Sequence, residues 1–438
     1  MAGAFLHPEI ETLDDAALRR YQDGLWVRQW NHVRERSQFY RARLGRRTGR
    51  ACTLDELAEL ALTEKADVKA EQEATYPFGG HVACDPRQII RLHRTSGTTG
   101  RAMVIAYTRN DAEIVARLGG RGFFMAGLRP GDRVVHCLNY CLWTGGVTDH
   151  INLEYAGATV VPFGVGQSRL LVQVIEELGV NAISCTPSYP ALLEKVLREE
   201  LGKEPRALKL RLGLFGGEAG LDNPAFRERL ESVWGFGVRN ANFGLSEIMS
   251  IMGSQCEATT DLHFHGGDAI FVEILDPATG ARLPIAEGTC GELVCTHLVK
   301  ECQPLVRYRT RDVITVTGTG PCRCGRTAWR FRVTGRTDDM FNVRGVNVFP
   351  TAIQHVIAGM PELTSGHFRI VLRGPGPYNR VDLNVEAAER LAPAHWPAAA
   401  ARLAGEIKAA IGASAEVTIL AFEALGRTDG KTSLIERS

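Results

Sequence analysis

Long hydrophobic runs and an excess of one charge are missing from this chain, and no leader sequence is expected. No apolar stretch approaches the ~20 residues that a bilayer-spanning helix needs. The N-terminus carries Glu9, Glu11, Asp14 and Asp15 and no uninterrupted apolar core, which argues against a signal or transit peptide. A net charge of +1 implies no bulk attraction to nucleic acid or to an anionic membrane.

A disulfide framework is also missing. Eleven cysteines are spaced irregularly along 438 residues, which without a secretion signal favours reduced thiols and a cytoplasmic protein. Internal repeats are absent, and the only biased tract is the alanine-rich stretch at residues 398–404. The length exceeds that of one typical hydrophobic core, so two or more domains are expected.

The order of apolar and polar runs predicts the fold class. Residues 1–80 have mostly helical periodicity. From about 89 to 245, short apolar runs alternate with helical stretches, which is typical of β-α-β units around a parallel sheet. The apolar runs lie at residues 133–137, 158–162, 182–185 and 212–215, and the helical stretches include 169–178 and 191–201.

Two further regions differ from this pattern. Strands separated by Pro/Gly turns at 269–316 predict a small antiparallel or barrel-like subdomain. After Gly335, helices at 350 onward and 394–412 mix with strands at 340–349, 368–372, 381–385 and 417–420. We therefore predict an α/β fold with a large N-terminal domain, 1–335, and a separate small α+β C-terminal lid domain, 336–438.

A hydroxyl- and glycine-rich segment is the most informative stretch of the chain. It consists of Thr95, Ser96, Gly97, Thr98, Thr99 and Gly100. Apolar flanks predict a strand, a loop and a second strand, in which hydroxyl and N–H groups close around phosphate oxygens. Arg101 follows where a Walker loop would need other spacing and a lysine. For the segment alone, an ordinary surface turn is the alternative.

Residues 243–247 place an aromatic ring, a hydroxyl and a carboxylate together. Phe243 can stack on a nucleobase, Ser246 can bond a phosphate and Glu247 can hold Mg²⁺ against that phosphate. The alternative is structural, with Glu247 capping a helix and Phe243 in the core.

Three other polar positions suit the same chemistry. Asp312, at a strand edge, can accept both ribose hydroxyls, although a surface strip of ion pairs is the alternative. Asp338 lies where the composition changes, and torsions there can rotate the small domain. Lys431 occupies a glycine-flanked turn that can deliver an ammonium to a developing negative charge. A solvated tail lysine is its alternative.

These segments occur in the order and spacing of adenylate-forming enzymes, and the chain most resembles the phenylacetate–CoA ligase family. The similarity runs from roughly residue 20 to the end, and residues 335–350 are its most specific part. The shared motifs are SGTTG (96–100), NYCLWTGG (139–146), TPSY (186–189), FGGE (215–218), FGLSE (243–247), RYRTRD (307–312), GRTDDMFNVRGVNVFP (335–350) and TDGK (428–431).

The resemblance implies two half-reactions. A carboxylate attacks the α-phosphate of Mg·ATP to give an acyl-adenylate and pyrophosphate, and the thiol of coenzyme A then displaces AMP. By position, residues 95–100 would hold the triphosphate, Phe243 would stack the adenine and Ser246 would contact the α-phosphate. The residues implied to surround the nucleotide further include Gly217, Glu218 and Gly244.

The same resemblance implies roles in the C-terminal third. Glu247 would ligate Mg²⁺, Asp312 would bind the ribose hydroxyls and Arg336 would assist it. Asp338 would be the hinge, and Lys431 would stabilise charge in adenylation before it swings away. Two positions depart from the family pattern: Arg101 stands where lysine is usual, and Phe243 replaces the usual tyrosine.

A metal site is a separate prediction. Cys322 and Cys324, with the distant Cys256 and one histidine of the pair His263 and His265, form a donor set suited to structural Zn²⁺, and the resemblance implies His263 as the fourth ligand. Reduced thiols and exposed histidines are the alternative. Some relatives in the resembled family carry a similar pattern, and such a zinc would pin the antiparallel subdomain.

The acid would occupy a flat-walled pocket. Its predicted lining is Tyr140, Trp143, Gly145, His150 and Gly216. Aromatic walls and small residues suit an aromatic acid, of phenylacetate or benzoate type, although core packing is the alternative for Trp143.

We therefore expect an ATP- and Mg²⁺-dependent aryl-acid:CoA ligase whose partners are ATP, coenzyme A and an aromatic carboxylic acid. One alternative is an adenylating enzyme that passes its acyl-AMP to an amine or a carrier-protein thiol. Another, from a different class, is a catalytically silent nucleotide-binding module. No nucleic-acid or membrane partner is expected, and a homodimer is left open.

Overall fold

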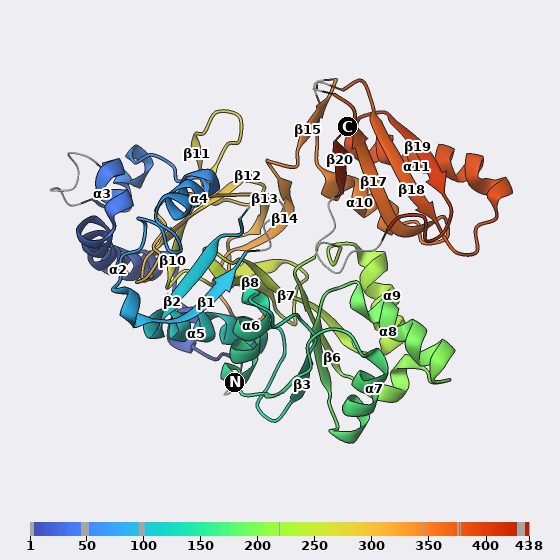
Figure 1. Ribbon diagram of the computed structural model, residues 1–438, viewed down its shortest axis with the longest axis horizontal. Coiled ribbons are helices and arrows are strands. Elements are labelled where there is room, and N and C mark those ends of the chain that lie inside the picture. The colour runs from blue at the N-terminus through green and yellow to red at the C-terminus, as the bar shows by residue number, and fades with distance from the viewer. Residues whose placement is uncertain are drawn as a thin grey trace. The chain divides into compact units, whose positions relative to one another are not determined.

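The computed structural model describes residues 4–44, 52–95, 101–218, 220–344, 346–374, 376, 378–426 and 434–437. The chain forms two compact units (Figure 1). The first comprises residues 1–217, 233–310 and 315–332, and the second comprises 218–232, 311–314 and 333–438. The domain boundary between residues 335 and 336 stays a prediction.

Helices dominate the first 80 residues, as the periodicity predicts. Asp14 caps the longest of them, α2, by accepting a hydrogen bond from the backbone N–H of Ala17 at 2.7 Å. The helices up to residue 234 are α1 (Pro8–Glu11), α2 (Asp15–Arg36), α3 (Gln38–Leu44), α4 (Lys65–Ala74), α5 (Arg109–Met125), α6 (Thr144–Tyr155), α7 (Ser168–Glu177), α8 (Tyr189–Lys195) and α9 (Pro224–Trp234). Three short 3₁₀ helices are η2 (Glu56–Glu59), η3 (Pro86–Gln88) and η5 (Pro205–Leu208). A π-helical segment, η4 (Val196–Glu200), follows α8 directly.

The predicted β-α-β strands form the parallel half of a twelve-stranded sheet. These strands are β3 (Arg133–His136), β4 (Thr159–Pro162), β5 (Ala182–Cys185), β6 (Leu212–Gly216) and β7 (Gly237–Leu245). They pair in the order β4-β3-β5-β6-β7, and all four pairings are parallel. β5 and β6 are buried along their whole length, as expected for strands covered on both faces.

The remaining strands extend the same sheet beyond β7. They are β8 (Met249–Gln255), β9 (Leu262–Phe264), β10 (Ile270–Leu275), β11 (Arg282–Leu283), β12 (Cys290–His297), β13 (Tyr308–Gly318) and β14 (Arg330–Arg336). The full order is β11-β10-β12-β13-β14-β9-β8-β7-β6-β5-β3-β4. Within residues 269–316, β10 pairs antiparallel with both β11 and β12, as predicted, but these strands continue the large sheet instead of closing into a separate barrel-like body.

Two helices cover the centre of this sheet. α5 packs on β7 and β8, and α6 packs on α5, as the ribbon shows (Figure 1). Phe123 on α5, Leu153 on α6 and Leu214 on β6 are each 1% exposed or less in one apolar cluster. Asn152 of α6 fills a notch at Gly119, because a Cβ there would lie 2.0 Å from its amide nitrogen.

The hairpin β1 (Ile89–Arg94) and β2 (Val104–Thr108) flanks the hydroxyl-rich segment. The two strands pair antiparallel, which confirms the two flanking strands expected there. Ser96, Gly97, Thr98, Thr99 and Gly100 lie outside the described residues.

The second unit has its own sheet and core. Its strands β17 (Thr364–Leu372), β18 (Val381–Ala387), β19 (Ala415–Leu420) and β20 (Ile435–Arg437) are ordered β19-β18-β17-β20. The helices α10 (Pro350–Ala358) and α11 (Trp396–Ile411) pack on it, and α11 buries Ala399, Leu403 and Ile407 at helical spacing. A two-stranded ribbon, β15 (Phe341–Val343) with β16 (Val346–Val348), precedes them, and η6 (Pro393–His395) leads into α11.

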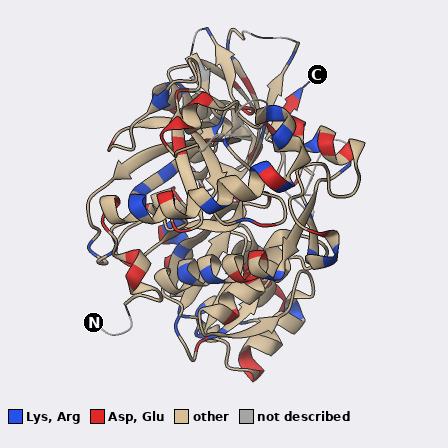
Figure 2. Cartoon of the chain, turned by 90° about the vertical axis from the view of Figure 1, so that its left-hand side faces the viewer, with Lys and Arg blue, Asp and Glu red and all other residues tan. Residues whose placement is uncertain are grey.

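Charges of both signs are interspersed along the helices and strands (Figure 2), as the near-zero net charge implies. Among the described residues, no helix combines the length and the apolarity that a membrane span requires.

Candidate functional site

Two hydrogen bonds join the residues on either side of the hydroxyl-rich segment, one between backbone groups and one to a side chain. The N–H of Thr95 donates to the carbonyl of Met103 at 3.0 Å, and the N–H of Met103 donates to Thr95 Oγ1 at 3.2 Å. Arg101 places its guanidinium carbon 4.4 Å from the centre of the Tyr76 ring. The residue that replaces the family's usual lysine is therefore stacked on an aromatic side chain.

The hairpin is joined to the predicted acid pocket. The N–H of Arg94 donates to the carbonyl of Leu142 at 2.9 Å, and Arg94 forms a β-bridge with Trp143. The indole of Trp143 is 40% exposed, so its core-packing alternative does not hold. This pairing brings residues 142–143 next to the start of the hydroxyl-rich segment.

The FGLSE motif covers the last three residues of β7 and the start of the turn that leads to β8. Gly244 is required there, because a Cβ would lie 2.2 Å from the carbonyl oxygen of Ser250. Phe243 is half-buried and meets the Phe331 ring edge-on at 5.2 Å between centroids. Ser246 and Glu247 lie in a turn between strands, so the alternative in which Glu247 caps a helix is wrong.

Glu247 is a nearly buried carboxylate, 7% exposed. The hydroxyl of Tyr308 donates to its Oε1 at 2.7 Å, and Lys65 Nζ lies 3.2 Å from the same oxygen. The Lys65 side chain is 52% exposed, so its ammonium has room to move away. A divalent cation could replace that positive charge at the carboxylate. Sequence reasoning did not identify Lys65.

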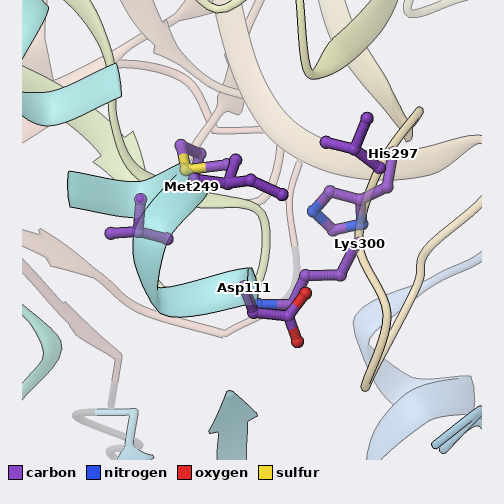
Figure 3. A pocket seen from close by; sticks show the side chains of 7 residues that line it. Asp111, Met249, His297 and Lys300 are labelled. Atoms are coloured by element: carbon purple, nitrogen blue, oxygen red, sulfur yellow. The ribbon is translucent and has the colours of Figure 1, made fainter. Parts of the chain in front are cut away.

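The buried His297 holds this turn through two hydrogen bonds to the backbone. His297 Nε2–H donates to the carbonyl of Ile248 at 2.8 Å, while Nδ1 accepts from the N–H of Leu305 at 2.9 Å. Burial lowers the pKa of His297 to about 4. Figure 3 shows the small hollow that His297 lines together with Asp111, Met249 and Lys300. None of the predicted site residues lines it.

The ribose candidate and the hinge candidate share an arginine. Arg336 Nη1 lies 2.7 Å from Asp312 Oδ1. The same guanidinium also donates two hydrogen bonds to the carboxylate of Asp338, both at an N···O distance of 2.9 Å. Asp312 lies inside β13 and not at a strand end, which corrects the expectation of a strand edge.

The acid-pocket candidates on α6 form a hydrogen-bonded chain. Tyr140 Oη lies 3.0 Å from His150 Nδ1, and His150 Nε2 lies 3.1 Å from Glu154. The carbonyl of Gly145 accepts from the buried His136 at 3.2 Å. Tyr140, His150 and Gly145 therefore lie around the start of one helix.

Gly216 ends β6, where the pairing register with β7 shifts. A Cβ at Gly216 would lie 2.4 Å from Cβ of Asn242, so only glycine allows this approach. Gly217 follows with φ +81°, in the left-handed region that favours glycine. Glu218 is exposed.

Sequence reasoning missed a buried pair next to these glycines. The side-chain amide of Asn242 donates to Asp149 Oδ2, and Asp149 is 1% exposed. Burial raises the pKa of Asp149 well above its ordinary value. The pair links α6 to the strand that carries Phe243.

The four predicted metal ligands converge. The donor atoms of Cys256, His263, Cys322 and Cys324 all lie within 4.8 Å of one another. Two of the separations are 3.9 Å, between the sulfurs of Cys256 and Cys322, and 3.8 Å, between Cys324 Sγ and His263 Nε2. A tetrahedral zinc with Zn–S bonds of about 2.3 Å separates its sulfurs by about 3.8 Å. The donor set therefore fits Zn²⁺, and the alternative of exposed histidines does not hold, because His263 is buried.

Not every candidate can be placed. Lys431, like residues 96–100, lies outside the described residues. Within the described part, the structure brings together the metal ligands, the Arg336 pairs, and the hairpin with the acid-pocket segment.

Comparison with known proteins gives matches along nearly the whole chain. Residues 41–297 match the AMP-binding enzyme model, and residues 345–436 match the AMP-binding enzyme C-terminal domain. The phenylacetate-coenzyme A ligase of Thermus thermophilus is 37% identical over 87% of this chain and 84% of its own length. That of Pseudomonas putida is 36% identical over 98% of this chain and 95% of its own length.

A solved structure is similar over the whole chain. The 2-hydroxyisobutyryl-CoA ligase in the postadenylation state, in complex with 2-HIB-AMP, matches with a TM-score of 0.90 and 27% identity. The match covers 100% of this chain and 93% of that one.

Proposed function

The chain belongs to the AMP-binding enzyme family and is an AMP-forming acid–CoA ligase of the phenylacetate-CoA ligase type, and we propose that its acid is aromatic. In the first half-reaction, a carboxylate oxygen attacks the α-phosphorus of ATP and pyrophosphate leaves. In the second, the thiol of coenzyme A attacks the acyl carbon, AMP leaves and the thiol proton is released. The aromatic preference is supported by the ring of Tyr140, which meets that of His150 edge-on, and by the exposed Trp143 two residues before Gly145.

The observation that carries the site assignment is the environment of Glu247. A nearly buried carboxylate with one neutral donor, Tyr308, and one displaceable cation, Lys65, is suited to exchange Lys65 for Mg²⁺. Mg²⁺ bound there would neutralise charge on the phosphates during adenylation. Neighbouring Ser246 would contact the α-phosphate, and Phe243 would stack the adenine.

We assign the other nucleotide contacts to the predicted segments. Residues 95–100 would hold the triphosphate, with backbone around Gly217, Glu218 and Gly244 near the nucleotide. Asp312 would accept the ribose hydroxyls while Arg336 orients its carboxylate, as their 2.7 Å contact supports. Lys431 would neutralise charge on the reacting carboxylate and phosphate, and Asp338 would be the hinge.

We further propose that the Cys₃His cluster holds a structural Zn²⁺. All four candidate ligands are protein side chains, which suits a closed structural site and leaves no position for substrate. The metal would hold the turn at residues 322–324 against β9 and would take no part in the reaction.

A substrate panel tests the reaction. Phenylacetate, benzoate and their ring-substituted derivatives should support pyrophosphate release from Mg·ATP, and AMP should accumulate when coenzyme A is added. Pyrophosphate exchange without consumption of coenzyme A would favour an enzyme that acylates an amine or a carrier-protein thiol. Absence of any acid-dependent release would favour a silent nucleotide-binding module.

Glu247→Gln tests the metal assignment. Loss of the charge should lower the adenylation rate by about 100-fold, a typical effect of removing electrostatic stabilisation of the transition state, and should raise the Mg²⁺ concentration needed. Glu257→Gln is the matched control, because Glu257 is an exposed carboxylate that forms a surface ion pair with Arg129. Equal activity of the two variants would remove Glu247 from the site.

A further inference from the structure

α6 buries a polar face. Thr144, Thr148, Asp149 and Asn152 are each at most 4% exposed. Five of their side-chain atoms have no hydrogen-bond partner among the described residues: Thr144 Oγ1, Thr148 Oγ1, Asp149 Oδ1, Asn152 Nδ2 and Asn152 Oδ1. Each such group costs roughly 1–3 kcal/mol when left unsatisfied, so this concentration on one helix calls for a partner.

Asp149 has the strongest requirement for one. Its Oδ2 accepts from the Asn242 amide, and its Oδ1 is buried without a hydrogen-bond partner among the described residues. No cation pairs with it in the described ion pairs, and burial favours the neutral carboxylic acid. A neutral carboxyl group presents both a donor and an acceptor to a ligand.

The position of Asp149 relates it to the acid. Its Oδ2 lies 3.8 Å from the point where a Cβ of Gly145 would stand, and its partner Asn242 touches Gly216. Both glycines belong to the predicted acid pocket. Asn242 also lies in β7, three residues before the strand ends at Leu245, or roughly 10 Å along it, and Ser246 begins the turn that follows. Since the reacting carboxylate would meet the α-phosphate near Ser246, Asp149 is positioned for the opposite end of the acid.

We propose that Asp149 is a specificity-determining residue that hydrogen-bonds a hydroxyl or amino group on the ring of the acid, so that hydroxylated or aminated aryl acids are preferred over unsubstituted ones. This inference rests on the proposed function, because it concerns the same acid site. Asn242 orients the Asp149 carboxyl group through Oδ2 and leaves Oδ1 for the substituent.

The test measures kcat/KM for acid-dependent pyrophosphate release by the full-length chain. The probes are phenylacetate and benzoate, each compared with its ortho-, meta- and para-hydroxy and amino derivatives. The wild type should prefer at least one substituted acid over its parent by roughly 10- to 100-fold. The hydroxy and amino arms identify which substituent Asp149 accepts.

Asp149→Ala should abolish that preference while the unsubstituted parent acid is still adenylated, and Asp149→Asn, which keeps the shape, should reduce it. Asp132→Asn is the matched control, because Asp132 is another buried carboxylate, paired with Arg211 and Asn181. It should leave the preference unchanged.

The outcomes separate the two proposals. If the wild type adenylates parent and substituted acids equally well, or if Asp149→Ala keeps the full preference, the assignment of Asp149 is overturned and the proposed function stands. If the wild type adenylates no acid of the panel, the proposed function fails, and the inference fails with it. Where Asp149→Ala does not fold, Asp149→Asn decides the matter, because an unchanged preference in that variant overturns the assignment and a reduced one supports it.

Discussion

His297 shows how one side chain holds a functional turn in place. Its two ring nitrogens connect the carbonyl of Ile248 to the N–H of Leu305, and the ring is fully buried. Both hydrogen bonds require the neutral imidazole, with the proton on Nε2 and a lone pair on Nδ1. Ile248 directly follows Glu247, so protonation of His297 would disturb the backbone beside the proposed magnesium ligand.

This arrangement predicts a pH dependence of stability. The pKa of His297 is about 4 in the folded chain, against 6.5 for an ordinary histidine. Between these values the unfolded chain binds the additional proton, so the free energy of unfolding falls as pH drops from about 6.5 to about 4. The contribution of this residue approaches about 1.4 kcal/mol per pH unit.

Urea denaturation at pH 7, 6 and 5 checks this expectation. His297→Gln should have a lower free energy of unfolding at pH 7. Its free energy of unfolding should also fall less steeply on acidification, with a slope that differs from the wild type by the uptake of at most one proton. His395→Gln is the control, since that histidine is exposed. Identical pH slopes for the wild type and His297→Gln would contradict the role.

Among single residues, the site residues that belong to short sequence motifs could be predicted. Site residues that are brought to the site by tertiary contacts could not. Glu247 belongs to a readable motif, but its partner Lys65 comes from α4, far away along the chain. Asp149 was likewise missed, because its local pattern is that of any polar helical residue. Its burial is set by packing of α6 on α5 and by Asn242.

At the scale of elements, the cysteine turn fastens the N-terminal segment. The N–H of Cys322 donates to the carbonyl of Arg326 at 2.8 Å. The Arg326 side chain then forms a buried ion pair with Glu11 of α1 at 2.5 Å and donates to the carbonyl of Ala4 at 3.0 Å. A metal that fixes this turn would therefore also fix residues 4–11.

Metal removal should loosen both the cysteine turn and the N-terminal segment at residues 4–11. We expect about one zinc per chain in the purified protein, and a melting temperature several degrees lower after chelation or in Cys324→Ser. The N-terminal segment should then be cleaved faster by protease, because the turn that carries Arg326 loosens. Mass spectrometry of the fragments locates the cut.

Cys290→Ser is the matched control, since Cys290 is an exposed thiol at the start of β12. It should retain zinc, melting temperature and protease resistance. A wild-type protein that contains no stoichiometric zinc and does not respond to chelator would refute the metal proposal.

Most individual elements could be predicted because their hydrophobic periodicity is local. The parallel strands β3 to β6 and the helix α11 fall within a few residues of the expected bounds. The strand β20 was missed, since three residues carry too little periodicity. The continuity of the sheet across β7 and β8 was missed for another reason: strand pairing is a long-range property that composition does not encode.

At the scale of the whole molecule, the proposed reaction needs different groups in its two steps. We assign Lys431 to the first step only, since the thiol of coenzyme A requires access during the second. Lys431→Ala should therefore lower adenylation by 100-fold or more and leave thioesterification of supplied acyl-AMP within a few-fold of the wild type.

Single-turnover assays of each half-reaction check this separation. Lys408→Ala is a suitable control, because Lys408 is an exposed lysine in the last turn of α11. Equal loss in both half-reactions would contradict the assigned role of Lys431.

The two compact units are interleaved along the chain, and this has a consequence for synthesis on the ribosome. The second unit includes residues 218–232 and 311–314, and the twelve-stranded sheet places β14 between β13 and β9. In the folded sheet β9 pairs with β14, which ends at residue 336. During synthesis the edge of β9 therefore stays unpaired until β14 has left the exit tunnel. Truncated translation products ending before that point should present an open strand edge and depend on chaperones to stay unaggregated.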